Sequence, residues 1–376
     1  MSTIRVVALA AVLTSCAGVE GPVEIDRFIE DQMARAKLPG LSAAVIRDGR
    51  VVWTGAYGWA DVAARRPVGT ETRFQLASVS KTITATVIMR QVERGRLDLD
   101  ADVNVMLPFR VRSPSHPDAV ITLRHLMTHT SGIRDNWDIL EGTWVEGGDF
   151  PMSLAASLSA YLVDGGKYYV DDKNWYPWAS ETKSEYSNVG VALAAYLAEI
   201  AAGEPFESLC RRDVFEPLGL SGCSFRLADV DRSTLARPHE WGEEIGQWIG
   251  LEHHGYLDFP SGTLRMSAPE LARFLLAYAG GGEVGGARLL RSETVEEMFR
   301  VQDEALDPDQ GLVWYREVRD GEVLFGHDGG DPGVTTQMFF RRADGAGYLL
   351  LANGDFEARG VEREIAARLL HHALGE

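Results

Sequence analysis

The spacing of apolar and polar positions predicts both helices and strands at the two ends of the chain and mainly helices in the middle. Residues 23–37 carry apolar side chains at helical intervals, which indicates a helix with one buried face. Apolar runs at 41–46 and 51–53 then flank Asp48-Gly49, a dipeptide that strongly favours a tight turn between two strands. The chain is therefore predicted to begin with a helix followed by an antiparallel hairpin.

From about residue 78 to residue 215 the helical spacing dominates. We expect helices near residues 79–94, 122–129, 153–163, 189–202 and 206–215. A helix is also expected after residue 267, and strands and a last helix follow at 312–317, 322–326, 334–341, 346–353 and 361–373. Because both ends of the chain supply strands, we expect an α/β fold in which about 22–77 and 216–376 share one sheet, with an all-helical region at about 78–215 inserted.

Composition limits the class of protein. A chain of 376 residues with 45% hydrophobic residues can bury a substantial core. The formal net charge of −18 argues against nucleic acid as a partner, because phosphate binding needs basic patches and the arginines here are scattered among acids. The acidic charge otherwise indicates only solubility.

The first sixteen residues resemble an export signal. Arg5 precedes an apolar run from Val6 to Leu13, and small residues lead to Cys16. The ending Leu13-Thr14-Ser15-Cys16 resembles a bacterial lipobox, in which the cysteine is lipidated and becomes the mature N-terminus. We expect residues 1–15 to be a signal peptide, and the mature protein to lie in the periplasm or cell envelope with lipidated Cys16 as its membrane attachment.

Two further cysteines, Cys210 and Cys223, admit two interpretations. In an exported protein they can form a disulfide, and otherwise they are two ordinary buried thiols. The sequence favours neither.

The strongest chemical signal is at Ser78 and Lys81, which stand three residues apart where a polar run becomes an apolar helical one. Residues i and i+3 share one face of a helix, so the Lys81 amine can reach the Ser78 hydroxyl. Serine becomes a good nucleophile when a base takes its proton, and burial can lower the pKa of a lysine enough for that task. Ser180 and Lys183 repeat the spacing inside a polar stretch, but of the lysines only Lys81 precedes a mostly apolar helical pattern.

Two further motifs are ambiguous on their own. Tyr186 and Asn188 stand at the start of an apolar helical pattern, where they either face one cleft or serve as a core aromatic and a helix N-cap. The run from Phe325 to Gly333 contains His327 and lies between two predicted strands. Its glycines either let the backbone approach a ligand closely or form a surface hairpin.

Together and in this order, the three motifs resemble those of the serine β-lactamase and penicillin-recognising enzyme superfamily. The similarity is closest to the class C β-lactamase-related group, which includes D-alanyl-D-alanine carboxypeptidases, D-aminopeptidases and esterases. Segments at 95–108, 121–133, 215–220 and 264–274 support it, so the resemblance covers about residues 23–375. It implies a β-lactamase/transpeptidase-like fold, an antiparallel sheet flanked by helices, as one catalytic domain over 16–376.

The resemblance also implies a reaction. It implies a serine hydrolase that forms an acyl-enzyme with an ester, amide or β-lactam, and a slowly deacylating penicillin-binding sensor is the alternative. Ser78 would be the nucleophile, Lys81 its proton acceptor and Tyr186 the proton shuttle to the leaving group. No metal or other cofactor is implied, the substrate is a small molecule or short peptide, and the oligomeric state is left open.

The same resemblance implies a substrate-binding set. Asn188 would hold the substrate amide, and His327 occupies the first position of the third motif. Gly329 and Gly330 bring the backbone close, and the N–H groups of Ser78 and Gly330 would form the oxyanion hole.

The third motif departs from the family at Asp328, where a hydroxyl residue that helps to bind a substrate carboxylate is usual. A cleft-facing Asp328 would repel a carboxylate, and His327 in place of lysine removes a fixed positive charge near pH 7. Both changes favour an esterase or D-amino-acid peptidase over an efficient β-lactamase, unless strand alternation turns Asp328 away. Four tryptophans are expected either to line the mouth of the cleft or to pack the helical region: Trp137, Trp144, Trp175 and Trp178.

Overall fold

The centre of the molecule is a seven-stranded sheet with the order β12-β13-β14-β15-β1-β2-β3. The structure is a computed structural model, and it describes residues 22–355 and 360–375. The predicted signal peptide and Cys16 lie outside the described residues, so export and lipidation stay predictions.

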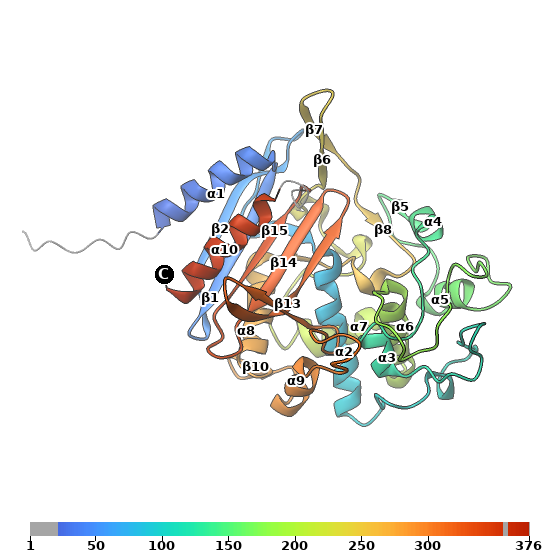
Figure 1. The fold of residues 1–376 in the computed structure, drawn as a ribbon. Helices are drawn as coiled ribbons and strands as arrows, with labels where there is room; N and C mark the ends of the chain where they lie inside the picture. The colour runs from blue at the N-terminus through green and yellow to red at the C-terminus, as the bar shows by residue number, and fades with distance from the viewer. Residues whose placement is uncertain (1–21, 356–359, 376) are drawn as a thin grey trace, which may run out of the picture.

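Both ends of the chain contribute strands to this sheet (Figure 1). Its strands are β1 (Gly40–Arg47), β2 (Arg50–Asp61), β3 (Arg66–Pro67), β12 (Tyr315–Arg319), β13 (Glu322–Asp331), β14 (Val334–Phe340) and β15 (Gly347–Ala352). β1 pairs antiparallel with both β2 and β15, which joins the N-terminal hairpin to the C-terminal strands. Asp48 and Gly49 form the β1–β2 turn with φ of 51° and 70°, the left-handed conformation that this dipeptide favours.

The two faces of the sheet are covered by different helices. α1 (Pro22–Ala36) and α10 (Val361–Leu374) pack against one face, where Leu41 and Val45 of β1 join their core. α8 (Ala268–Ala279) packs against the other face, where Ala44 and Ile46 of β1 join the main core. Successive side chains of a strand point to opposite faces, so burial on both sides explains why β1 is almost entirely apolar apart from Ser42.

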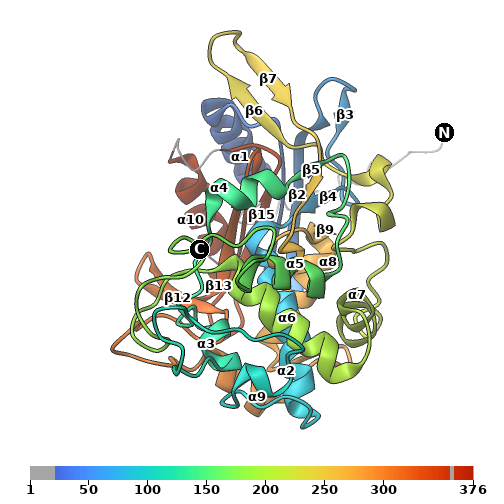
Figure 2. The ribbon, with the colours of Figure 1, turned by 90° about the vertical axis from the view of Figure 1, so that its right-hand side faces the viewer.

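The middle of the chain forms a helical region in which α6 packs against α2 (Figure 2). Its helices are α2 (Ser80–Glu93), α3 (Leu123–Met127), α4 (Trp137–Leu140), α5 (Leu154–Leu162), α6 (Asn188–Ala202) and α7 (Phe206–Cys210), the last continued by a π-helical turn, Arg211–Phe215. α6 is apolar on nearly all sides, which fits its burial. No single helix among the described residues is long and apolar enough to span a bilayer, and α6 with Phe206–Phe215 passes that test only as a pair bent by 81°.

Several elements differ from the sequence-based prediction, most clearly β13 and one hairpin. The sequence predicts that the strand after residue 322 ends at residue 326, but β13 continues to Asp331 because its glycines pair in register with β14, Gly329 opposite Thr336. The hairpin of β6 (His239–Gly242) and β7 (Gln247–Gly250), which projects from the body in both views, was not predicted. The other helix and short strands are α9 (Ser292–Phe299), β4 (Arg73–Gln75), β5 (Val145–Glu146), β8 (His254–Gly255), β9 (Arg265–Ser267), β10 (Glu283–Val284) and β11 (Ala287–Arg288).

Cys210 and Cys223 are both free thiols, so the disulfide interpretation is wrong; the alternative of two ordinary buried thiols holds in full for Cys210, whereas Cys223 is only partly buried. The physical reason is that the two side chains have different surroundings. Cys210 lies in the main core with no exposed surface, whereas Cys223 lies beside Arg73 and Glu270. Burial raises the pKa of both thiols, which favours the unreactive protonated form.

Candidate active site

Ser78 lies in a short 3-10 turn, Ala77–Val79, that leads directly into α2. Two hydrogen bonds hold the residue before this turn: the Leu76 N–H donates to the Leu264 carbonyl (2.8 Å), and the Thr336 hydroxyl donates to the Leu76 carbonyl (2.6 Å). Ala77 has a φ of 45°, a left-handed conformation that is uncommon outside glycine. The fold thus presents Ser78 on a sharp, well-held connection between a strand and a helix.

Lys81 lies in the first turn of α2, and it has no exposed surface. Its ammonium nitrogen donates to Ser78 Oγ at 2.9 Å and to the carbonyl oxygen of Ser261 at 2.8 Å. Burial lowers the pKa of Lys81 to about 8, although nearby carboxylates, Asp258 foremost, oppose the shift. This lysine can therefore exchange a proton near neutral pH, unlike an exposed lysine.

Tyr186 reaches Ser78 from the segment before α6. Its hydroxyl donates a hydrogen bond to Ser78 Oγ at 2.8 Å, and the Lys81 nitrogen lies 4.9 Å from the centre of its ring. Tyr186 is 44% exposed, so the interpretation as an ordinary core aromatic is wrong. Its hydroxyl end nevertheless points into the protein at Ser78, and burial raises the pKa of Tyr186 above its usual value.

Asn188 is the first residue of α6, and Ser187 caps the helix through a hydrogen bond from the Gly190 N–H to the Ser187 hydroxyl (2.9 Å). The capping alternative for Asn188 is therefore wrong. Asp135 holds this helix start, because its carboxylate accepts from the Asn188 N–H (2.7 Å) and from the Asn188 side-chain amide (2.8 Å). The same carboxylate also accepts from the Ser187 hydroxyl (3.1 Å) and the Val189 N–H (3.2 Å).

His327 lies on β13, buried with 2% of its surface exposed. Its Nδ1 is 2.5 Å from the carbonyl oxygen of Asp328, so Nδ1 carries the proton that is donated. Burial lowers the pKa of His327 to about 4, which leaves the ring neutral at pH 7. The centre of its ring lies 6.4 Å from that of Tyr186, so the third motif borders the second.

The residues after His327 alternate between the two sides of β13. Of the two orientations considered for Asp328, the structure shows the one away from the cleft: the side chain is 56% exposed and lies beside Tyr315. Gly329 packs on the Ser78 turn, where a Cβ would come within 2.7 Å of the Ser78 nitrogen. Gly330 lines the cleft, but a Cβ there would meet no atom within 4 Å, so close backbone approach requires a glycine only at Gly329.

A cleft opens beside Ser78, and its empty space, including the part open to solvent, is about 370 Å³. Trp137 and Trp144 line it, whereas Trp175 is 3% exposed within the helical core and Trp178 stacks on Tyr176. The expectation of a cleft lining therefore holds for Trp137 and Trp144, and packing in the helical region holds for Trp175, while Trp178 contacts Tyr176 and Lys183. The other lining residues are Ala77, Ser78, Leu140, Asn188, Tyr256, Asp258, Ser261, Gly330 and Asp331.

Two of these lining residues, Asp258 and Asp331, are carboxylates with no ion pair to a basic side chain within residues 22–355 and 360–375. Asp258 accepts from the Ser261 hydroxyl (2.8 Å), and Asp331 accepts from the Gln75 amide (2.6 Å). Burial raises the pKa of each carboxyl to about 6. Both are therefore mostly ionised at pH 7, and they make the cleft negative.

The second serine–lysine pair is not assembled into a site. The Ser180 hydroxyl donates to the Val120 carbonyl (2.6 Å), and the Lys183 ammonium lies over the Trp178 ring, 4.4 Å from its centre. Sequence reasoning missed Asp135, Asp258 and Ser261. Asp331 lies within the motif from Phe325 to Gly333 that the sequence singles out. Asp135, Asp258 and Ser261 have no short-range signal in the sequence that could have identified them.

The chain belongs to the β-lactamase family, because the sequence model of that family, described as Beta-lactamase, matches residues 25–373. Esterase EstB of Burkholderia gladioli is 32% identical over 240 residues, which cover 61% of this chain and 57% of the esterase. A β-lactamase of Escherichia coli (strain K12) is 27% identical over 269 residues, covering 70% of this chain and 64% of the relative. The match thus spans less than two thirds of each of these two relatives.

Comparison with solved structures supports the same family. The octameric penicillin-binding protein homologue from Pyrococcus abyssi superimposes with a TM-score of 0.73 at 25% identity, covering 94% of this chain and 77% of that one. The predicted β-lactamase/transpeptidase-like fold is confirmed.

Proposed function

We propose that this chain is a serine hydrolase that works through an acyl-enzyme. The observation that carries the proposal is the pair of short hydrogen bonds to Ser78 Oγ, from Lys81 at 2.9 Å and from Tyr186 at 2.8 Å. A serine held between two proton-exchanging groups, at the edge of a cleft, is the arrangement that nucleophilic catalysis needs.

In the first step Ser78 Oγ bonds to the carbonyl carbon of the substrate while its proton passes to Lys81. The backbone N–H groups of Ser78 and Gly330 then stabilise the oxyanion, which is consistent with the close packing of Gly329 on the Ser78 turn. The bond to the leaving group breaks as Tyr186 gives it a proton, and Lys81 returns the serine's proton to Tyr186. In the second step water attacks the acyl-enzyme, the acid is released and the Ser78 hydroxyl is restored.

The assignment of the first proton acceptor is supported by opposite pKa shifts. Burial lowers the pKa of Lys81 to about 8 and raises the pKa of Tyr186, so near neutral pH the lysine can be free to accept a proton while the tyrosine holds its own. Because the two groups share Ser78 Oγ and stand side by side, they exchange protons as a pair.

The substrate class that the cleft supports is an ester or amide, with preference for one that bears a protonated amine. Asp258 and Asp331 line the cleft beside the aromatic rings of Trp137, Trp144 and Tyr256, and carboxylates with aromatic faces suit an ammonium group. The neutral ring of His327 supplies no positive charge for a substrate carboxylate. An esterase or D-amino-acid peptidase is therefore favoured over an efficient β-lactamase.

The test is covalent labelling by a fluorophosphonate probe, together with turnover of nitrophenyl esters, nitrocefin, D-alanyl peptides and D-amino-acid amides. We expect Ser78→Ala to abolish labelling and to lower turnover by about 1,000-fold or more, because the nucleophile is lost. Ser180→Ala is the matched control and should label like the wild type. Labelling that persists in Ser78→Ala refutes the proposal, and a burst of one equivalent without turnover replaces the hydrolase by a slowly deacylating sensor.

A further inference from the structure

His129 contacts the chain on both sides of Tyr186. Its carbonyl oxygen accepts a hydrogen bond from the Glu185 N–H at 2.8 Å, and its ring Nδ1 accepts one from the Ser187 N–H at 3.2 Å. The centre of its ring lies 4.4 Å from the centre of the Tyr186 ring. One residue thus binds both main-chain donors that flank Tyr186 and packs on the side chain between them.

The backbone of His129 has a φ of 59°, in the left-handed region that residues other than glycine adopt uncommonly. The residue is also buried, with 4% of its surface exposed. An ordinary buried histidine needs neither this conformation nor two hydrogen bonds to one tripeptide. Here the conformation goes with a carbonyl and a ring that both meet the same segment.

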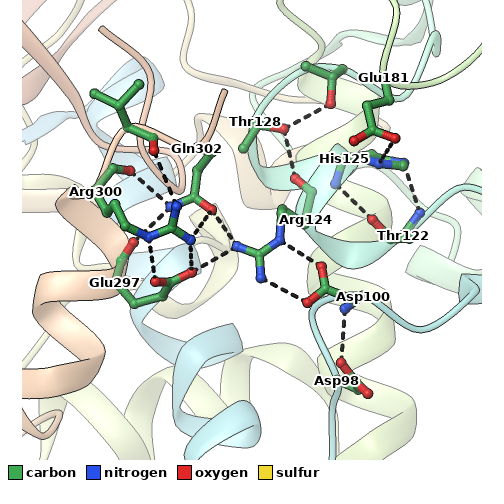
Figure 3. A network of polar contacts seen from close by, with 12 residues as sticks. Asp98, Asp100, Thr122, Arg124, His125, Thr128, Glu181, Glu297, Arg300 and Gln302 are labelled. Carbon is green, nitrogen blue, oxygen red and sulfur yellow. Dashed lines mark hydrogen bonds and ion pairs between the residues drawn. The ribbon is translucent and has the colours of Figure 1, made fainter. Parts of the chain in front are cut away.

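The helix that ends just before His129, α3, is itself fixed at the surface. Arg124 of α3 donates to Asp100 (2.7 Å) and to Glu297 (2.8 Å), so three separate segments meet there, as Figure 3 shows. The Thr128 hydroxyl donates to the Arg124 carbonyl (2.9 Å) at the end of the helix. His129 therefore follows a helix whose position is fixed by hydrogen bonds to other segments.

Tyr186 needs such a support because it is 44% exposed. Its hydroxyl must stay within hydrogen-bonding distance of Ser78, and a displacement of about 1 Å from the reactive geometry can cost about 100-fold in rate. The ring of His129 accepts at Nδ1, so it must be neutral to make its bond. Burial lowers the pKa of His129 to about 3, with Lys81 and His327 as the facing basic groups, so it is neutral at pH 7.

We propose that His129 is a positioning residue that fixes Tyr186 against Ser78 by binding the main chain at Glu185 and Ser187. The catalytic part of this inference rests on the proposed hydrolase function. We call the two main-chain hydrogen bonds of His129, to the N–H groups of Glu185 and Ser187, the clamp. Its existence is a structural question and can be tested without measuring turnover.

The test compares His129→Asn with His129→Gly. Asparagine and glycine both accept a left-handed backbone, but only asparagine keeps a side-chain acceptor near the position of Nδ1. We expect His129→Gly to lower kcat on the best nitrophenyl ester, and the rate of fluorophosphonate labelling, by about 100-fold, with KM changed by less than about threefold. His129→Asn should recover at least about tenfold of that loss.

His125 of α3 provides the matched control, because its Nδ1 also accepts a main-chain hydrogen bond, from the Thr122 N–H at 3.3 Å at the start of that helix. His125→Asn and His125→Gly should lower the melting temperature and leave kcat near the wild-type value. Equal kcat in His129→Asn and His129→Gly, or an equal loss in the His125 pair, overturns the proposal.

Amide hydrogen exchange over residues 181–188 tests the clamp independently of activity. Exchange should quicken in His129→Gly and stay near the wild-type rate in His129→Asn, because only the latter keeps the acceptor for the Ser187 N–H. Unchanged exchange in His129→Gly overturns the clamp. A wild type that labels no better than Ser78→Ala, with the expected exchange pattern, refutes the hydrolase function and leaves the clamp standing.

Discussion

Two walls of the cleft are built in opposite ways. The helical wall carries Ser78, Lys81 and Tyr186 near the starts of α2 and α6. Ser78 and Lys81 stand three positions apart, whereas Tyr186 reaches Ser78 from 108 positions further along the chain. The loop wall carries Asp258, which lies just before the 3-10 turn Phe259–Ser261, and Asp331 at the end of β13. Local helix geometry thus places Lys81 beside Ser78, and the tertiary fold adds Tyr186 and the two carboxylates.

The two walls meet at Lys81. Its ammonium donates to the Ser261 carbonyl, and the Ser261 hydroxyl donates to Asp258. Asp258 is the largest of the charges that raise the pKa of Lys81 against the effect of burial. The loop wall therefore tunes the base of the helical wall, so the division between chemistry and charge is not complete.

The largest effect is expected from a substitution that removes the proposed base of the helical wall and leaves the loop wall unchanged. Lys81→Ala should lower the rate of fluorophosphonate labelling by about 1,000-fold, because a positioned base typically contributes 100- to 10,000-fold. Lys183→Ala, in the second serine–lysine pair, should change it by less than about twofold, since that ammonium lies over Trp178. Equal effects of the two substitutions would remove Lys81 from the proposed mechanism.

A smaller effect would sharpen the role of the loop wall. Asp331→Asn should lower kcat/KM for an amine-bearing ester by about tenfold while a neutral ester of equal size changes by less than about twofold, because a bond between two charges is lost. Asp328→Asn is the matched control on the same strand, and its exposed side chain points away from the cleft. Steady-state kinetics with the ester pair would show whether charge selectivity lies at Asp331.

The smallest effect would test the link between the walls. Labelling should rise with pH as Lys81 loses its proton, with a midpoint near its pKa of about 8. Asp258 raises that pKa, so Asp258→Asn should move the midpoint to a lower pH. Asp328→Asn should move it less, because Asp328 contributes the least of the four carboxylates that act on Lys81. A midpoint that rises or stays in Asp258→Asn would contradict the link.

Prediction from the sequence was most successful where the interacting groups are close along the chain. The Ser78–Lys81 contact follows from helical spacing, and the β1–β2 turn follows from Asp48-Gly49. It failed where the interacting groups are distant along the chain. Asp135 accepts hydrogen bonds at the start of α6 from more than fifty positions upstream, and no local sequence pattern indicates that pairing. The end of β13 was missed because glycines lower strand propensity, while their pairing with β14 decides the outcome.

The sequence by itself determined the family, the order of most strands of the central sheet and of most of the longer helices, and the serine with its lysine, since spacing and motif order are local properties. Only the tertiary structure decided what surrounds them. It turned Asp328 outward, placed Asp258 and Asp331 in the cleft, left Cys210 and Cys223 unpaired, and set His129 against Tyr186. Each of these outcomes depends on burial and on contacts between segments distant in the chain, and such contacts leave no periodic pattern in the sequence.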